Sequence, residues 1–136
     1  PNVADMRAIA KAAVEGGADA LSLINTLVGM AIDIHSMRPV LGNITGGLSG
    51  PAIKPVALRC VWEVSQAVSV PVIGMGGICS ATDALEFIMA GASAVAIGTG
   101  LLIDPELPRK VTQGIKEYCE SRGIESLQEI VGAAWR

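Results

Sequence analysis

The chain is 136 residues long, and 51% of its residues are hydrophobic while 17% are charged. This composition excludes a disordered chain and favours a core of small aliphatic side chains, as in a parallel sheet covered by helices. The net charge of −3 and the aromatic content of 3% argue against nucleic-acid binding. The three cysteines form no C-x-x-C pair, so the sequence predicts neither a disulfide framework nor a metal site and favours a reducing, cytoplasmic setting.

Helical and strand-like segments alternate along most of the chain, as judged from apolar spacing, glycines and capping residues. The predicted helices cover residues 2–16, 52–68, 80–90 and 104–122, with a short one from Ser126, and the predicted strands cover residues 20–24, 43–45, 70–73 and 94–97. The capping box that starts at Ser80 marks the third helix. Residues 27–48 interrupt the alternation with Pro and Gly, which predicts a long loop or hairpin.

Residues 87–102 form a long apolar stretch without a charged residue. The stretch contains three glycines, and Glu86 and Asp104 flank it instead of Lys or Arg. We therefore predict a helix end that leads into a buried strand, and no membrane span.

Four parallel strands with flanking helices correspond to half of a (β/α)8 barrel, since a complete barrel takes about 250 residues. The predicted fold class is therefore α/β, as half of a TIM barrel. The chain begins at Pro1 without an initiator Met or a basic signal segment. An open parallel sheet exposes two edges, so we expect the chain to need a missing N-terminal half or a partner.

Glycine-rich turns follow two consecutive predicted strands, as Gly74-Met75-Gly76-Gly77-Ile78 and Gly98-Thr99-Gly100. In barrels, the loops after the last two strands often form a phosphate site, because glycine lets backbone N–H groups approach the anion. Tight turns without a ligand are the alternative, and neither a Rossmann fingerprint nor a P-loop is present. A third turn, Gly46 to Pro51, either offers the Gly50 N–H to a ligand or packs against the rim.

Other polar candidates are few. Asn25-Thr26 lies at the tip of a predicted strand, where barrel chemistry takes place, and either binds a flat polar ligand or ends the strand in a turn. His35 is predicted to be a solvated loop residue. Cys60, Cys79 and Cys119 are predicted to pack rather than to act as nucleophiles. The sequence therefore shows binding groups but no obvious catalytic acid or base.

Several of these motifs occur together in one known family. The segments are Ile24-Asn25-Thr26-Leu27, Asn43-Ile-Thr-Gly-Gly-Leu-Ser-Gly-Pro-Ala-Ile-Lys-Pro55 continuing to Arg59, Gly74 to Ile78, and Gly98-Thr99. Together they resemble the C-terminal half of dihydroorotate dehydrogenase, over essentially the whole chain. The resemblance is strongest to the catalytic subunit of the NAD-linked, class 1B members.

The resemblance implies that residues 1–136 are the C-terminal half of one FMN-binding barrel domain. Such a domain oxidises dihydroorotate to orotate in pyrimidine (UMP) biosynthesis. The resemblance assigns FMN contacts to Ile24, Gly50, Gly76, Gly77, Gly98 and Thr99, and contacts with the pyrimidine to Asn25 and Thr26. It places the proton-abstracting Cys and an FMN-contacting Lys outside these residues, so no catalytic residue and no unaided catalysis are expected here.

The resemblance also implies a partner. In class 1B enzymes, two catalytic and two electron-transfer subunits assemble, and the latter carry FAD and a 2Fe-2S cluster that pass electrons to NAD. None of the cysteines of this chain is expected to bind that cluster. Two alternatives stay open: a dihydropyrimidine dehydrogenase-like flavoprotein, and a non-catalytic half-barrel that binds a phosphorylated ligand or serves in assembly.

Overall fold

The computed structural model describes residues 2–135, which form three sheets and five α-helices. The strands are β1 (Leu21–Leu23), β2 (Leu27–Met30), β3 (Ile32–Asp33), β4 (Arg38–Pro39), β5 (Thr45–Leu48), β6 (Val72–Met75) and β7 (Ala94–Ala96). The α-helices are α1 (Met6–Glu15), α2 (Lys54–Ser65), α3 (Ala81–Met89), α4 (Thr99–Ile103) and α5 (Leu107–Arg122). Short 3-10 helices are η1 (Pro51–Ile53), η2 (Leu127–Ile130) and η3 (Ala133–Trp135).

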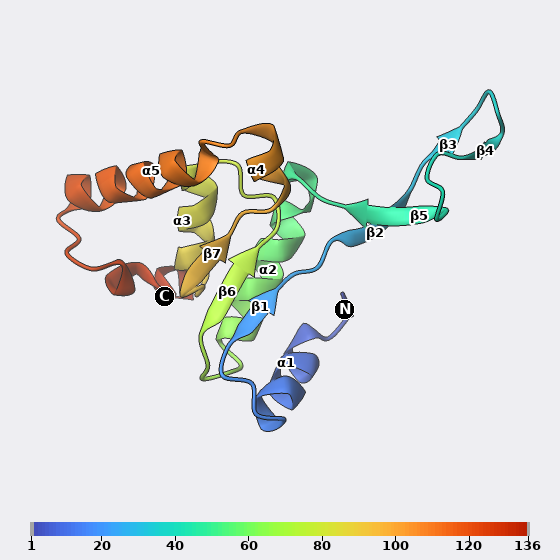
Figure 1. The fold of residues 1–136 in the computed structure, drawn as a ribbon. Helices are drawn as coiled ribbons and strands as arrows, with labels where there is room; N and C mark the ends of the chain where they lie inside the picture. Colours follow the sequence, from blue (N-terminus) through green and yellow to red (C-terminus); the bar gives the residue numbers. More distant parts are fainter. Residues whose placement is uncertain (1, 136) are drawn as a thin grey trace.

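A parallel sheet in the order β1, β6, β7 forms the centre of the fold (Figure 1). Gly74 of the middle strand is paired with Leu23 on one side and with Val95 on the other. Parallel neighbours need a long crossover, and α2 and α3 lie in the two crossovers. The predicted α/β class with flanking helices is confirmed.

The two crossover helices pack on one face of the parallel sheet, behind the strands in Figure 1. Ala57, Val61 and Val64 of α2 and Phe87 of α3 are completely buried there. Apolar spacing predicts Ile53, Val56, Ala57, Val61 and Val64 as the inner stripe of the second helix, and this prediction is confirmed at the three α2 positions above. It is wrong for Val56, which is exposed, because successive residues lie about 100° apart around a helix.

Side chains on the opposite face of the sheet stay partly in solvent. Ser22, Ile73 and Ala94 are paired side by side across the three strands. Ser22 and Ala94 are exposed and Ile73 is half-buried. Within residues 2–135, β1 and β7 are also unpaired at their outer edges. The prediction of an open parallel sheet is therefore confirmed.

Residues 27–48 fold into an antiparallel ribbon that projects from the body of the chain (Figure 1). β2 pairs with β5 and β3 pairs with β4, so the predicted hairpin is confirmed. The prediction that a strand at 43–45 joins the parallel sheet is wrong. β5 pairs antiparallel with β2 instead, so this segment closes the ribbon and does not become a parallel neighbour of β1. The parallel sheet has three strands rather than four.

The bounds of several elements differ from the prediction for local reasons. β6 starts two residues later than predicted and includes Gly74, which the sequence placed in a turn. A Cβ at Gly74 would lie 2.7 Å from the Phe87 ring, so this glycine lets α3 pack against the strand. α1 starts at Met6 because the side chain of Asp5 accepts the N–H of Ala8 at 3.1 Å and caps the helix.

The apolar residues 87–102 end α3, form β7 and then continue into α4. The predicted passage from a helix end into a strand is confirmed, whereas α4 was not predicted. Among the helices that the structure describes, none is both long enough and apolar enough to span a bilayer.

Candidate functional site

Three loops and the segment after β1 meet at the carboxyl ends of the parallel strands and line a cleft of about 120 Å³. The loops are the segment from β5 into η1, the turn after β6, and the turn from β7 into α4. The cleft is lined by Ile24, Thr26, Ser49, Gly50, Ile53, Met75, Gly76, Gly77, Ile78, Cys79, Ala96, Gly98, Thr99 and Gly100. Of the residues that the resemblance assigns to ligand binding, all but Asn25 line this cleft.

The turn after β6 depends on glycine at two consecutive positions. Gly76 and Gly77 have φ angles of 128° and 76°, which side-chain-bearing L-residues rarely adopt. A Cβ at Gly77 would lie 2.6 Å from the carbonyl oxygen of Gly50, and one at Gly76 would lie 2.8 Å from the Cβ of Ala57. The turn after β6 therefore packs directly against the Gly50 loop.

Gly98 has open space beside its backbone. A Cβ built on it would meet no protein atom within 4 Å. Because Gly98 lines the cleft, its missing side chain keeps space open there. Open space beside a glycine backbone is what a phosphate group bound by main-chain N–H groups requires.

A side-chain hydrogen bond links two of the cleft-forming loops. The hydroxyl oxygens of Ser49 and Thr99 lie 2.9 Å apart. Sequence reasoning selected Thr99 and missed Ser49. The available signal for Ser49 was its position beside Gly50 in a turn already suspected of ligand binding.

Asn25 and Thr26 follow β1 directly but have different surroundings. Thr26 lines the cleft, whereas Asn25 lines a neighbouring groove against α1, together with Asn2 and Met6. The Asn25 Oδ1 accepts the backbone N–H of Thr26 at 2.9 Å, and the Asn2 side chain donates to the Asn25 carbonyl at 2.8 Å. The structure thus places Thr26 beside the glycine loops, while the Asn25 oxygen serves the turn after β1.

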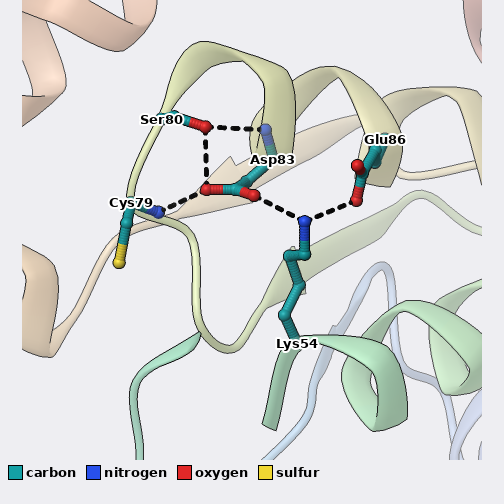
Figure 2. Close-up of polar contacts among 5 residues, drawn as sticks. All are labelled: Lys54, Cys79, Ser80, Asp83 and Glu86. Carbon is teal, nitrogen blue, oxygen red and sulfur yellow. Dashed lines mark hydrogen bonds and ion pairs between the residues drawn. The ribbon is translucent and has the colours of Figure 1, made fainter. Parts of the chain in front are cut away.

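An ion-pair network lies beside these loops (Figure 2). The Lys54 Nζ is 2.6 Å from the Asp83 Oδ1 and 2.8 Å from the Glu86 Oε2. The second Asp83 oxygen accepts the N–H of Cys79 at 2.9 Å and the hydroxyl of Ser80 at 2.8 Å. The Ser80 Oγ also accepts the Asp83 N–H, so the predicted cap at Ser80 is confirmed. In a standard capping box the Asp83 carboxylate would accept the Ser80 N–H, whereas here it accepts the Cys79 N–H.

The network changes the protonation of its members. Burial tends to raise the pKa of Asp83, but hydrogen bonds from Lys54, Cys79 and Ser80 outweigh it and hold the pKa below its ordinary value. Hydrogen bonds to Asp83 and then to Glu86 raise the pKa of Lys54. The Asp83–Lys54 pair is therefore charged at neutral pH. Sequence reasoning missed it, because 29 residues separate the partners.

The remaining reactive side chains show one departure from prediction. Cys60 is buried in α2, and this burial raises the pKa of its thiol, as expected of a packing residue. Cys119 is partly buried in α5. Cys79 was predicted to pack, but it is exposed, because the glycine turn after β6 carries it to the rim of the cleft. His35 is exposed on the ribbon, as predicted.

The cleft is suited to binding rather than to acid–base chemistry. Its lining holds no carboxylate, imidazole or amine, and it offers main-chain groups, hydroxyls, a thiol and apolar surface. A whole small-molecule site takes roughly 300–1,000 Å³, so this cleft suits a phosphate-sized part of a ligand. The residues present therefore fit a phosphate group, such as that of the expected FMN.

A parallel sheet with glycine loops at the carboxyl ends of its strands defines an α/β protein, and the cleft lies at the edge of the sheet where such proteins bind their ligands. The profile of the family described as dihydroorotate dehydrogenase matches residues 1–119. The chain belongs to the dihydroorotate dehydrogenase family.

Similar proteins include catalytic subunits of dihydroorotate dehydrogenase B (NAD+). Over 133 residues, the chain is 61% identical to the subunit of Geotalea daltonii and 62% identical to that of Pelobacter propionicus. Each alignment covers 98% of this chain and 44% of the relative. The chain thus spans less than half the length of these curated relatives.

The fold is also that of a solved family member. The crystal structure of the dihydroorotate dehydrogenase of Eimeria tenella in complex with ferulenol matches with a TM-score of 0.78 and 33% identity. The match covers 96% of this chain and 35% of that chain. The prediction of part of a dihydroorotate dehydrogenase TIM barrel is confirmed.

Proposed function

We propose that this chain supplies the flavin phosphate cleft and part of the pyrimidine site of an NAD-linked dihydroorotate dehydrogenase. The observation that carries the proposal is the convergence of Gly50, Gly77 and Gly98, from three separate loops, on one uncharged cleft. The reaction is the oxidation of dihydroorotate to orotate in pyrimidine biosynthesis. Residues 1–136 form the C-terminal half of one barrel domain, and an N-terminal half completes it.

The cleft residues hold FMN at its phosphate end. Gly50, Gly76, Gly77 and Gly98 present main-chain groups, the Thr99 hydroxyl adds a hydrogen bond, and Ile24 offers apolar surface. The isoalloxazine ring of bound FMN supplies an acceptor for two electrons. Because the cleft takes only part of a nucleotide, the rest of the FMN contacts the other half of the barrel.

The substrate lies beside the end of β1. Asn25 and Thr26 hydrogen-bond the pyrimidine, which requires the Asn25 amide to turn from the Thr26 N–H toward the ligand or to use its NH₂ group. This chain supplies no group that takes the substrate proton. That group belongs to the other half of the barrel, so residues 1–136 bind and orient the reactants.

Electrons leave through a second protein. The proposed partner is an electron-transfer subunit that carries FAD and a 2Fe-2S cluster and reduces NAD, in a heterotetramer of two catalytic and two electron-transfer subunits. The proposed location is the cytoplasm.

The decisive experiment uses the complete barrel protein. It is purified, its bound flavin is released and identified by mass, and the protein is mixed anaerobically with dihydroorotate, dihydrouracil or dihydrothymine. Bound FMN that is bleached by dihydroorotate alone supports the proposal. Bleaching by dihydrouracil or dihydrothymine instead indicates the dihydropyrimidine dehydrogenase-like alternative, which reduces uracil or thymine in the reverse direction, and a colourless protein that binds inorganic phosphate indicates a non-catalytic phosphate-binding module.

A further inference from the structure

Lys54 lies at the contact between two loops of the cleft. It is the first residue of α2 and follows Gly50 by one short 3-10 turn. A Cβ at Gly77 would lie 2.9 Å from the Lys54 Cβ and 3.1 Å from the Lys54 nitrogen. The position of Lys54 therefore decides how closely the Gly77 turn approaches the Gly50 loop.

The Lys54 side chain also reaches the far end of the Gly77 turn. Its ammonium group binds Asp83 at 2.6 Å and Glu86 at 2.8 Å, both on α3 (Figure 2). Asp83 in turn holds the N–H of Cys79, two residues beyond Gly77. The turn is thus close to Lys54 on one side, where a Cβ on Gly77 would find no room, and is hydrogen-bonded to Asp83 on the other.

The charged groups of this network act without touching the cleft. Neither Lys54, Asp83 nor Glu86 is among the residues that line it. Their side chains are 23%, 16% and 39% exposed. By contrast, Lys116 and Glu120 on α5 are 66% and 63% exposed and 3.7 Å apart. Shielded pairs with short charge-assisted hydrogen bonds hold their geometry better than exposed pairs do.

The arrangement also controls charge near the cleft. Without the Lys54 ammonium, Asp83 and Glu86 would face each other unneutralised on the first turns of α3. A pair of carboxylates beside a site for a phosphate group disfavours the anion through space. Lys54 therefore keeps the loops together and offsets the two negative charges.

We propose that Lys54 is a positioning residue for the flavin phosphate, because its ion pairs with Asp83 and Glu86 hold the Gly77 turn against the Gly50 loop. The inference rests on the proposed function of the cleft and deepens it. In this proposal, three residues outside the cleft hold the main-chain groups inside it in place.

The test measures the FMN dissociation constant of the complete barrel protein by flavin fluorescence. Lys54→Met keeps a long side chain without the charge, and Asp83→Asn keeps the shape of the carboxylate without its charge. We expect each variant to weaken FMN binding by about tenfold or more. Lys54→Arg can still donate to both carboxylates and should stay within about threefold of the parent.

Two control variants separate positioning from general stability. Lys116→Met removes a Lys–Glu pair on α5 and should leave FMN binding unchanged. Val64→Ala creates a cavity in the buried stripe of α2, near the end of the helix away from the cleft, and should lower the melting temperature. We expect Val64→Ala to keep the FMN dissociation constant of the parent when both are measured well below the melting temperature.

A second readout does not depend on FMN. Hydrogen exchange of the flavin-free protein should be faster for the amides of residues 76–80 in Lys54→Met than in the parent, because the hold on the Cys79 N–H is weakened. Lys116→Met should show the exchange rates of the parent in this segment.

The possible outcomes are distinct. Unchanged FMN affinity and unchanged exchange in Lys54→Met overturn the positioning role, as does a loss of affinity that Val64→Ala reproduces in full. If Lys54→Met does not fold, an unchanged dissociation constant in Asp83→Asn overturns it. If the parent binds no FMN, the proposed function fails instead, and the exchange experiment still tests whether Lys54 holds the turn.

Discussion

Ser49 and Thr99 are 50 residues apart in the chain, yet their hydroxyl oxygens lie 2.9 Å apart. Ser49 follows the end of the ribbon at β5, and Thr99 begins α4 after the last parallel strand. Both line the cleft. The hydrogen bond therefore joins two cleft loops that are far apart in the sequence.

Replacement of Thr99 by Val removes one hydroxyl and keeps the shape of the side chain. We expect the FMN dissociation constant of the complete barrel protein to rise about fivefold, which corresponds to about 1 kcal/mol for one hydrogen bond. Ser49→Ala tests the partner, and the double variant should lose less than the sum of the two. A Thr99→Val protein with parental FMN affinity would show that the hydroxyl does not contact the nucleotide.

Gly77→Asp places a side chain and a negative charge in the turn after β6. We expect a loss of at least roughly 3 kcal/mol in FMN affinity, about two decades, because the charge repels the phosphate and the Cβ displaces the Gly50 loop. Gly123→Asp is the matched control. Its φ of 66° is similar, its Cβ would meet no atom within 4 Å, and it does not line the cleft. If both variants retain the same amount of flavin after dialysis, Gly77 does not contact the FMN phosphate.

Two substitutions of Asn25 distinguish a role in the turn after β1 from a role in substrate binding. Asn25→Ala should leave FMN bound and lower kcat/KM for dihydroorotate by about tenfold or more. Asn25→Asp keeps an oxygen for the Thr26 N–H but loses the NH₂ donor. If Asn25 only ends the strand, Asn25→Asp should match the parent and Asn25→Ala should lose stability without a specific loss of kcat/KM.

The pH dependence of stability follows from the Lys54–Asp83 pair. The pKa of Asp83 is lower in the folded protein, so its contribution is present above about pH 4 and is lost as the pH falls through the folded value. The pKa of Lys54 is raised, so its contribution is present below about pH 10 and is lost only as the pH rises further. Thermal melts of Asp83→Asn should therefore show a flatter acid limb than the parent.

Asp104→Asn is the control for the acid limb. Its carboxylate also pairs with a lysine, Lys110, at 2.6 Å, but both side chains are more exposed than those of Asp83 and Lys54. Solvent screening weakens such a pair. We expect Asp104→Asn to change the acid limb less than Asp83→Asn does, and the reverse order would contradict the assignment of the acid limb to Asp83.

Local patterns in the sequence predicted much of the fold. The cap at Ser80, the buried stripe of α2 and the alternation of helices with parallel strands depend on residues a few positions apart. The glycine loops could also be selected, because they recur at the same place after consecutive strands. Residues that share the carboxyl edge of a parallel sheet come together by topology alone.

The features that escaped prediction depend on contacts between distant segments. Gly74 was assigned to a turn because its packing partner, Phe87, lies on the next helix. Lys54 gives no local sign that it binds Asp83. A parallel strand was expected at residues 43–45, but β5 pairs with β2 instead. Whether such a segment joins a ribbon or a parallel sheet depends on the strand that pairs with it and not on its own residues alone.

Residues 1–136 expressed alone are expected to associate rather than to form a stable, active monomer. The open sheet presents Ile73 beside exposed Ala94, and both outer strands lack a neighbour within the described residues. The ribbon adds apolar side chains in solvent, with Val28 83% and Met37 84% exposed. Sedimentation should show oligomers or aggregates, and co-expression with an N-terminal barrel half should restore a species that retains FMN. A folded monomer of 13.9 kDa that oxidises dihydroorotate with added FMN would refute the half-barrel assignment, because no other strands would then be needed to close the sheet or complete the site.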